Sequence, residues 1–234
     1  MSTGFSIEEE ALYDQTMAGV LNRLRKTRNP ADLLAVLRQT HKRFDRAYDA
    51  APAAARAAVA CRAGCGTCCH VPVGVQAHEV LLAAEYIQTH YAPDDLTAAV
   101  GRFADHRAAF AGRSMEERAA FKIPCALLRD NSCSIYEARP EACRSHHSRN
   151  LAGCRSNLDT GIDIVDVLIP EIRGRMFAVM LGIDQAVTEA GYDDRAYDFG
   201  SAMHEALTDS LCAVRWMQRQ PAFPDSCLEE SGEV

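Results

Sequence analysis

Most hydrophobic residues of the chain are spaced as they are on amphipathic helices. Apolar side chains recur every three or four positions in residues 33–48 and 199–214, which places them on one face of a helix. Ser6 and Glu9 form a capping-box pattern that begins a helix near the N-terminus. An Asn-Pro pair ending at Pro30 begins a second helix. The pattern therefore predicts helices at both ends of the chain.

The middle of the chain alternates helices with irregular segments. Helical patterns cover residues 77–91, 94–111 and 114–121. Residues 129–132 form a polar turn between two short apolar runs, which predicts a small β-hairpin. Residues 145–160 are polar and predict a loop. We therefore expect helices around an irregular centre.

Two long helices are predicted near the C-terminus. One covers about residues 170–190 and ends at Gly191, and the other covers about residues 197–218. Beyond Pro221 the sequence has four acidic and no basic side chains. We therefore expect residues 222–234 to form a disordered, acidic tail.

Together these elements predict a mainly α fold. We expect residues 1–221 to form a single helical domain, with a small β-hairpin and an irregular, cysteine-rich metal-binding centre within segment 61–147. The chain has 234 residues, 48% of them apolar, which is enough to bury a hydrophobic core without disulfides.

The charge balance and the N-terminal residues restrict the partners and the compartment. The formal net charge is −7, which argues against nucleic acid or an anionic membrane as partner, because both favour a basic surface. The first ten residues lack a signal-peptide pattern, and no apolar run approaches the ~20 residues of a membrane span. We therefore expect a cytoplasmic protein with no membrane or nucleic-acid partner. In such a reducing compartment, dense cysteines favour metal binding or catalysis over disulfides.

Ten cysteines are the unusual feature of the composition, and seven of them lie in two segments. In the first segment the gaps between cysteines are three, two and zero residues, and such short gaps let several sulfurs face one point. Gly64 and Gly66 permit the tight turns that this requires. A disulfide between the adjacent Cys68 and Cys69 would be strained. The expected metal ligands are Cys61, Cys65, Cys68, Cys69, Cys125, Cys133 and Cys143.

Seven thiols exceed the needs of one four-ligand site. The sequence leaves open whether two metals share thiolates or whether some cysteines are bystanders. His70, His146 and Cys154 are further candidates for ligands. Cys212 is expected to be a core residue on a helix face, and Cys227 is expected to have no role in the site.

The two segments together resemble a known family. The first reads Cys-x3-Cys-Gly-x-Cys-Cys and is followed by Glu79 on a predicted helix. The second begins at Cys125 and continues as Cys133-Ser-Ile-Tyr-Glu-x-Arg-Pro-x-x-Cys143-Arg. This pattern, over residues 61–147, is similar to the CxxCxxCC, or YkgJ-type, cysteine-cluster family. One departure is the first gap, which is three residues instead of two. The resemblance implies that the segment chelates zinc or iron.

The cysteine ligands restrict the metal without fixing it. Thiolates suit tetrahedral zinc, an iron–sulfur cluster or Cu(I). Flagellin lysine methylases are similar in their cysteine segment, and this likeness favours a cluster such as [4Fe-4S]. A methylase activity is not favoured, because no glycine-rich turn follows a strand to hold a methyl-donor nucleotide. The expected cofactor is therefore zinc or iron, as an ion or as a [4Fe-4S] cluster.

Basic residues surround the second cysteine segment. Four thiolates around Zn²⁺ leave a net charge of about −2, and the planar guanidinium of arginine is suited to offset it. We therefore expect Arg139 and Arg144 to bind beside the metal or cluster and stabilise its charge. The alternative is that the Arg/His-rich loop 139–155 binds an anionic substrate.

Three functions are compatible with these observations. The first is a metal-binding protein that chelates zinc or iron through the cysteine cluster. The second is a metalloenzyme, an iron–sulfur redox or protein-modifying enzyme, with loop 139–155 as its substrate site. The third is a thiol redox sensor that uses Cys68 and Cys69. The metal-binding function is favoured, because the sequence has no nucleophile motif, P-loop or dinucleotide fingerprint.

Overall fold

The computed structural model of the protein describes residues 4–161 and 166–228. The described chain is mainly helical, which confirms the expected fold class, and its strands form two short antiparallel pairs. The longer helices are α1 (Ile7–Leu24), α2 (Pro30–Asp49), α4 (Ala77–His90), α5 (Pro93–Phe110), α8 (Leu151–Thr160), α9 (Pro170–Glu189) and α10 (Phe199–Thr208). The shorter ones are α3 (Ala53–Ala57), α6 (Met115–Ala120), α7 (Glu141–Ser145), α11 (Cys212–Met217) and the 3-10 turns η1 (Thr67–His70) and η2 (Tyr136–Ala138).

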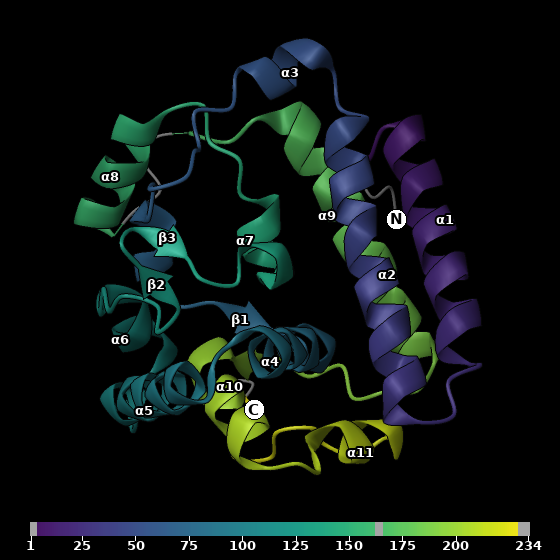
Figure 1. Ribbon diagram of the computed structural model, residues 1–234. Helices are drawn as coiled ribbons and strands as arrows, with labels where there is room; N and C mark the ends of the chain where they lie inside the picture. Colours follow the sequence, from purple (N-terminus) through teal and green to yellow (C-terminus); the bar gives the residue numbers. More distant parts are fainter. Residues whose placement is uncertain (1–3, 162–165, 229–234) are drawn as a thin grey trace, which may run out of the picture.

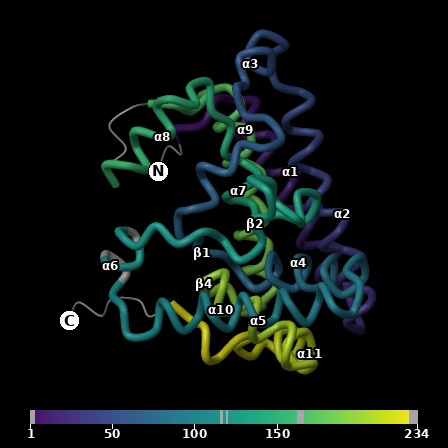
Figure 2. Tube along the Cα trace, turned by 60° about the vertical axis from the view of Figure 1, so that its left-hand side comes forward, coloured from purple at the N-terminus to yellow at the C-terminus, as the bar shows by residue number. Residues whose placement is uncertain are grey.

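The helices form two packed groups around a central segment. Helices α1, α2 and α9 lie side by side along one side of the molecule, and α4, α5 and α10 pack together across its base (Figure 1). Helix α7 lies near the centre in both views, beside α9 and the small hairpin (Figures 1 and 2). The predicted ligand segments therefore lie inside a frame of longer helices.

Local capping explains where the N-terminal helices begin. The Ser6 hydroxyl accepts a hydrogen bond from the backbone N–H of Glu9 at 3.4 Å, and the Glu9 carboxylate accepts one from the backbone N–H of Ser6 at 2.8 Å. The Asn29 side chain accepts a hydrogen bond from the N–H of Asp32 at 2.9 Å. These contacts satisfy N–H groups that have no partner within the helix. The capping predictions for both helices are confirmed.

Two short antiparallel strand pairs order segments that are otherwise irregular. Strand β1 (Gly74–Val75) pairs with β4 (Tyr197–Asp198), with Val75 opposite Tyr197. Strand β2 (Leu128–Arg129) pairs with β3 (Ser132–Cys133) in the predicted hairpin. The two turn residues, Asp130 and Asn131, have φ of 48° and 58°, as two-residue hairpins with right-handed twist require.

The hydrophobic core joins both helix groups. Its largest fully buried side chains include Trp216 of α11, Tyr197 of β4, Phe44 of α2 and Phe103 of α5. Burying a side chain of this size contributes about 1.5–3 kcal/mol each. Among residues 4–161 and 166–228, no helix is long and apolar enough to cross a membrane.

Residues 145–160 are not a loop, and this prediction is wrong. Most of the segment is helix α8, which begins after Asn150 and ends at Gly161. The Asn150 side chain accepts a hydrogen bond from the N–H of Gly153 at 2.9 Å, and Gly161 has φ of 71°. The helix buries little of its own surface, so its sequence has no hydrophobic periodicity to reveal it.

The C-terminal region also differs from the prediction. The expected single helix over residues 197–218 is β4, α10 and α11, with an extended break at Asp209. The Asp209 carboxylate accepts a hydrogen bond from the N–H of Leu211 at 2.8 Å, a local contact that competes with the helix. Residues 222–228 are not a disordered tail, because Ala222 and Phe223 are fully buried. Residues 229–234 lie outside the described chain.

Candidate metal centre

Main-chain hydrogen bonds bring the two cysteine segments together. The backbone N–H of Cys125 donates to the carbonyl oxygen of Cys69 at 2.7 Å. The N–H of Ala60 donates to the carbonyl oxygen of Ser148 at 2.8 Å, and the N–H of Ser148 donates to the sulfur of Cys61 at 3.2 Å. Both ends of the first cysteine segment are therefore hydrogen-bonded to the part of the chain that contains the second segment.

Cys68 is the common neighbour of the converging thiols. A negative charge on its sulfur raises the pKa of four other thiols, which requires that all lie near it. These are Cys69, Cys125, Cys133 and Cys143. Cys61 is affected in the same way. Six of the seven predicted ligands are thus electrostatically linked through Cys68.

Burial is the main cause of the raised pKa values in this group. It raises the pKa of the Cys125 thiol to about 11 and that of the Cys143 thiol further, and neighbouring thiolates add to both. The pKa of Cys68 is instead lowered to about 6, because Cys69 donates a hydrogen bond to its thiolate. The pKa of Cys69 is raised by that same bond. A thiophilic cation would replace the protons and offset the repulsion between thiolates, so the donor set fits such a metal.

A second group of thiols lies on the Cys61 side. Charges on Cys65 and Cys154 both raise the pKa of Cys61, after the larger effect of its burial. The Cys154 thiol donates to the Ser148 hydroxyl at 3.1 Å, and Ser148 also binds Cys61 through its N–H. Cys154 thus lies beside a predicted ligand, although sequence spacing alone left its part in the site open.

The sulfurs converge but are not tightly clustered. Among residues 4–161 and 166–228, the group of three or more potential ligand atoms that all lie within 4.8 Å of one another contains no cysteine. Four sulfurs bound about 2.3 Å from one zinc ion would lie about 3.8 Å apart. No three cysteine sulfurs of the described chain therefore lie as close together as the ligands of a mononuclear zinc site.

The two predicted arginines have different partners. A charge on Arg139 lowers the pKa of Cys68 and of Cys133, so its guanidinium lies near these thiols. The guanidinium also lies over the ring of Tyr136, 3.8 Å from its centroid. Arg144 pairs with the Asp45 carboxylate and donates to the carbonyl oxygen of Glu137. Arg139 therefore has the position that charge offset requires, whereas Arg144 joins α7 to α2.

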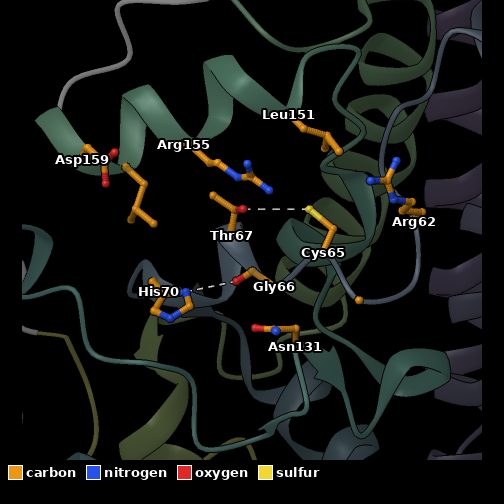
Figure 3. Close-up of a pocket in the computed structure, with 11 residues that line it drawn as sticks. Arg62, Cys65, Gly66, Thr67, His70, Asn131, Leu151, Arg155 and Asp159 are labelled. Atoms are coloured by element: carbon orange, nitrogen blue, oxygen red, sulfur yellow. Dashed lines mark hydrogen bonds between the residues drawn. The ribbon is translucent and has the colours of Figure 1, made fainter.

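A small cavity opens beside the first cysteine segment. Its volume is about 350 Å³, and Figure 3 shows Arg62 and Arg155 on either side of Cys65 at its edge. The His70 ring lines the same cavity with Nδ1 3.0 Å from the carbonyl oxygen of Gly66. A Cβ on Gly66 would lie 3.0 Å from Leu128 Cδ1 and 3.4 Å from the backbone of Asn131, so this loop packs closely on the hairpin. The cavity can admit a small anion next to a cysteine.

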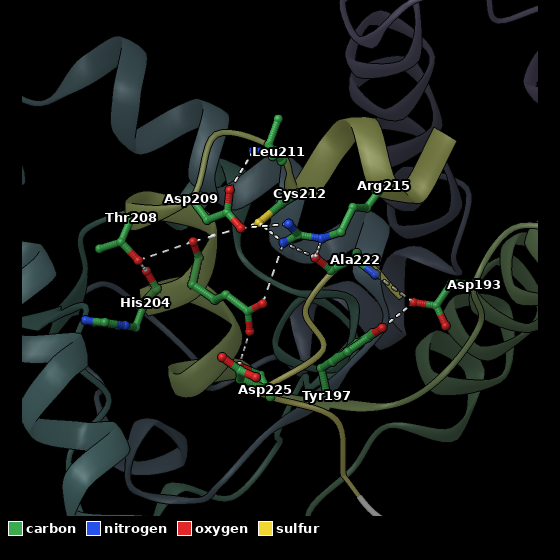
Figure 4. Close-up of polar contacts among 12 residues, drawn as sticks. Asp193, Tyr197, His204, Thr208, Asp209, Leu211, Cys212, Arg215, Ala222 and Asp225 are labelled. Atoms are coloured by element: carbon green, nitrogen blue, oxygen red, sulfur yellow. Dashed lines mark hydrogen bonds and ion pairs between the residues drawn. The ribbon is translucent and has the colours of Figure 1, made fainter. Parts of the chain in front are cut away.

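Several other candidates lie away from the converging thiols. Cys212 is 3% exposed, and Arg215 donates a hydrogen bond to its sulfur at 3.3 Å (Figure 4). It is a core residue, as expected. The Cys227 thiol donates to the carbonyl oxygen of Ala196 at 3.7 Å. The ring of His147 stacks on Tyr48 with centroids 4.8 Å apart.

Comparison with known proteins supports the resemblance seen in the sequence. Residues 60–159 match the model of the CxxCxxCC family, whose description is "Putative zinc- or iron-chelating domain". Neither the curated proteins nor the solved structures contain a match to the chain. The matched region includes all seven predicted ligands as well as Cys154 and the cavity residues Arg62 and Arg155. Residues 60–159, somewhat less than half of the chain, are thus similar to the CxxCxxCC family.

Proposed function

We propose that the protein binds an iron–sulfur cluster through thiolates gathered around Cys68. The observation that carries this proposal is the convergence of thiols around Cys68, no three of whose sulfurs all lie within 4.8 Å of one another among the described residues. In a cluster each thiolate binds a different iron, so the sulfurs lie farther apart than around one ion. The proposed ligands are Cys68, Cys125, Cys133 and Cys143, with Cys69 as a hydrogen-bond donor to the Cys68 thiolate.

The surroundings of these thiols support the same function. Buried thiolates repel one another, and a cluster core supplies the positive charge that holds them deprotonated. Arg139 lies near Cys68 and Cys133 with a permanent positive charge. Hydrogen bonds and charges of this kind also set the reduction potential of clusters. The protein is therefore proposed to hold a redox-active iron centre, with zinc as the alternative metal.

Anaerobic purification with metal and sulfide analysis tests this proposal. We expect brown protein containing iron and acid-labile sulfide in equal amounts. Colourless protein with one zinc and no sulfide would show that the centre is mononuclear. Cys212→Ser is the control, because its sulfur lies in the core beside Arg215 and its loss should leave metal content unchanged.

A metalloenzyme is the second candidate function, and the cavity in Figure 3 favours it. Two arginines and Cys65 face a volume of about 350 Å³, which suits a small anionic substrate. Inorganic phosphate should then slow alkylation of Cys65 in the metal-loaded protein, and Arg155→Ala should remove the protection. Arg149→Ala is the matched control, because that side chain pairs with Asp166 at 3.0 Å.

A thiol redox sensor is supported by one observation on Cys68. Its side chain is exposed and its pKa is lowered to about 6 by the hydrogen bond from Cys69, so its thiolate is populated at neutral pH. Reversible oxidation of Cys68 in protein that binds neither iron nor zinc would establish this function. Protection of Cys68 by a bound metal would instead support chelation.

A further inference from the structure

A second group of potential metal ligands lies outside the cysteines. His78 on α4, Glu141 on α7 and Asp184 on α9 each offer one ligand atom, and these atoms all lie within 4.8 Å of one another. His78 is 4% exposed and Glu141 is 2% exposed, whereas Asp184 is only partly buried. Three separate helices thus bring one imidazole and two carboxylates together, with access from the Asp184 side.

The polar atoms of this group are not all satisfied by protein partners. His78 Nε2 lies 3.0 Å from Glu141 Oε1. The other ring nitrogen of His78, Nδ1, and the other carboxylate oxygen of Glu141, Oε2, are buried without a hydrogen-bond partner. Leaving such atoms unpaired in the interior costs free energy. Glu141 thus has one carboxylate oxygen, Oε2, that no group of the described chain binds and that a cation could take up.

The charges around the group are also unbalanced. A third carboxylate, Glu79, accepts hydrogen bonds from the N–H groups of Gln76 at 2.7 Å and of Glu141 at 2.6 Å. Glu79 thus fixes α4 against the start of α7 and leaves Glu141 to face His78. Arg144 is a permanent cation close enough to lower the pKa of Glu141, but its guanidinium is paired with Asp45. Carboxyl groups therefore outnumber cationic groups around His78, and burial raises the pKa values of Glu141 and Asp184. A bound cation would replace their protons and stabilise the carboxylates.

We propose that His78, Glu141 and Asp184 bind a divalent first-row transition-metal ion, at a site separate from the thiolate centre. Ligand atoms about 2.1 Å from one ion lie about 3–3.5 Å from each other, and the three atoms offered here, all within 4.8 Å of one another, need only small shifts to bind one ion in place of the hydrogen bond between His78 and Glu141. Imidazole and carboxylate ligands suit ions such as Mn²⁺ and Fe²⁺, whereas thiolates select softer metals. Three protein ligands also leave coordination positions for water or a substrate.

The proposed ion would lie next to the cysteine centre. Glu141 and Cys143 are on the same short helix, α7, and a charge on Glu79 raises the pKa of Cys143. The two sites thus share one helix but differ in ligand chemistry. This difference allows them to be loaded and measured separately.

Titration of the purified, metal-loaded protein with Mn²⁺ tests the proposal, because Mn²⁺ has low affinity for thiolates. Free Mn²⁺ is measured by electron paramagnetic resonance. We expect one saturable Mn²⁺ per chain, and we expect Asp184→Asn and His78→Gln to weaken binding at least about tenfold with unchanged metal content at the cysteines. Asp166→Asn is the matched control, because that carboxylate pairs with Arg149 at 3.0 Å and is not a proposed ligand.

Two outcomes would overturn the proposal. One is the absence of saturable Mn²⁺ binding by the wild-type protein. The other is Mn²⁺ binding by Asp184→Asn with wild-type affinity, in a variant whose circular dichroism and cysteine-bound metal are unchanged. Both outcomes are independent of the proposed cluster, since the cysteine centre is quantified in the same samples by its own metal and sulfide content.

Discussion

The backbone N–H of Cys125 donates to the carbonyl oxygen of Cys69 at 2.7 Å. This bond joins two cysteine segments that are far apart in the sequence and holds their main chains together without help from the sulfurs. Helix α7 then brings Cys143 to the same region. The thiols are therefore brought together by backbone and helix contacts.

Single substitutions should separate ligands from bystanders. Cys125→Ser, Cys133→Ser and Cys143→Ser should each lower the metal content at least severalfold, because a hydroxyl is a poor replacement for a thiolate on a soft metal. Cys69→Ser should retain metal, because its proposed role is a hydrogen bond to Cys68. The measurement is metal per chain after anaerobic purification.

The controls for this series are cysteines outside the converging group. Cys212→Ser and Cys227→Ser should keep wild-type metal content, since their sulfurs bind Arg215 and Ala196 instead. Equal metal loss from Cys212→Ser and Cys143→Ser would show that the loss reports unfolding rather than ligand removal.

Removal of the charge on Arg139 should change the properties of the bound centre. Arg139→Ala takes away the permanent positive charge that lies near Cys68 and Cys133, which favours the oxidised, more positive cluster and so lowers its reduction potential. Arg139→Lys should restore only part of the shift, because an ammonium lacks the planar fork. Potentiometric titration of the purified proteins measures the effect.

A neighbouring arginine of the hairpin provides the control for Arg139. Arg129 lies in β2, and Arg129→Ala should leave the potential unchanged. Wild-type potential and metal content in Arg139→Ala would contradict charge offset and favour a role for Arg139 in binding an anionic substrate.

Much of the fold could be predicted because its signals are local. The Ser6 and Glu9 capping box and the polar turn at Asp130 and Asn131 act within a few residues, so the sequence alone reveals them. The convergence of the cysteine segments was also expected, since short gaps between thiols serve little other purpose.

The remaining features depend on contacts between distant parts of the chain. Arg144 is adjacent to a predicted ligand, but Asp45 on α2 holds its guanidinium. Cys154 lies on α8, a helix that the sequence did not reveal. It approaches Cys61 because both residues form a hydrogen bond with Ser148. The alignment of helices α4, α7 and α9 alone creates the His78 group. No spacing rule within one segment could have found these relationships.

Position 131 of the hairpin turn should accept glycine but not a β-branched residue. Asn131 has φ of 58°, a left-handed conformation that glycine adopts freely and that β-branched residues avoid. Asn131→Gly should therefore keep both the melting temperature and the metal content. Asn131→Val should cost about 1–2 kcal/mol of stability and lower metal retention, because the hairpin carries Cys133 and packs on Gly66. Thermal unfolding with metal analysis decides, and a Val variant that matches wild type in both would contradict this account.

Protonation of His41 should make the fold sensitive to acid. Burial lowers its pKa to about 3, and the positive charge of Arg144 adds to the effect, whereas in the unfolded chain the pKa is about 6.5. Between these values the unfolded state binds a proton that the folded state excludes. The free energy of unfolding should therefore fall as the pH falls below about 6.5, by up to about 1.4 kcal/mol per pH unit.

The variant His41→Leu tests this effect. It lacks the titrating group, so its free energy of unfolding should decline less steeply from pH 7 to pH 5. Urea unfolding across that range measures the slope, with the exposed His90 as control: His90→Leu should follow wild type, and a wild-type slope in His41→Leu would show that other groups cause the acid sensitivity.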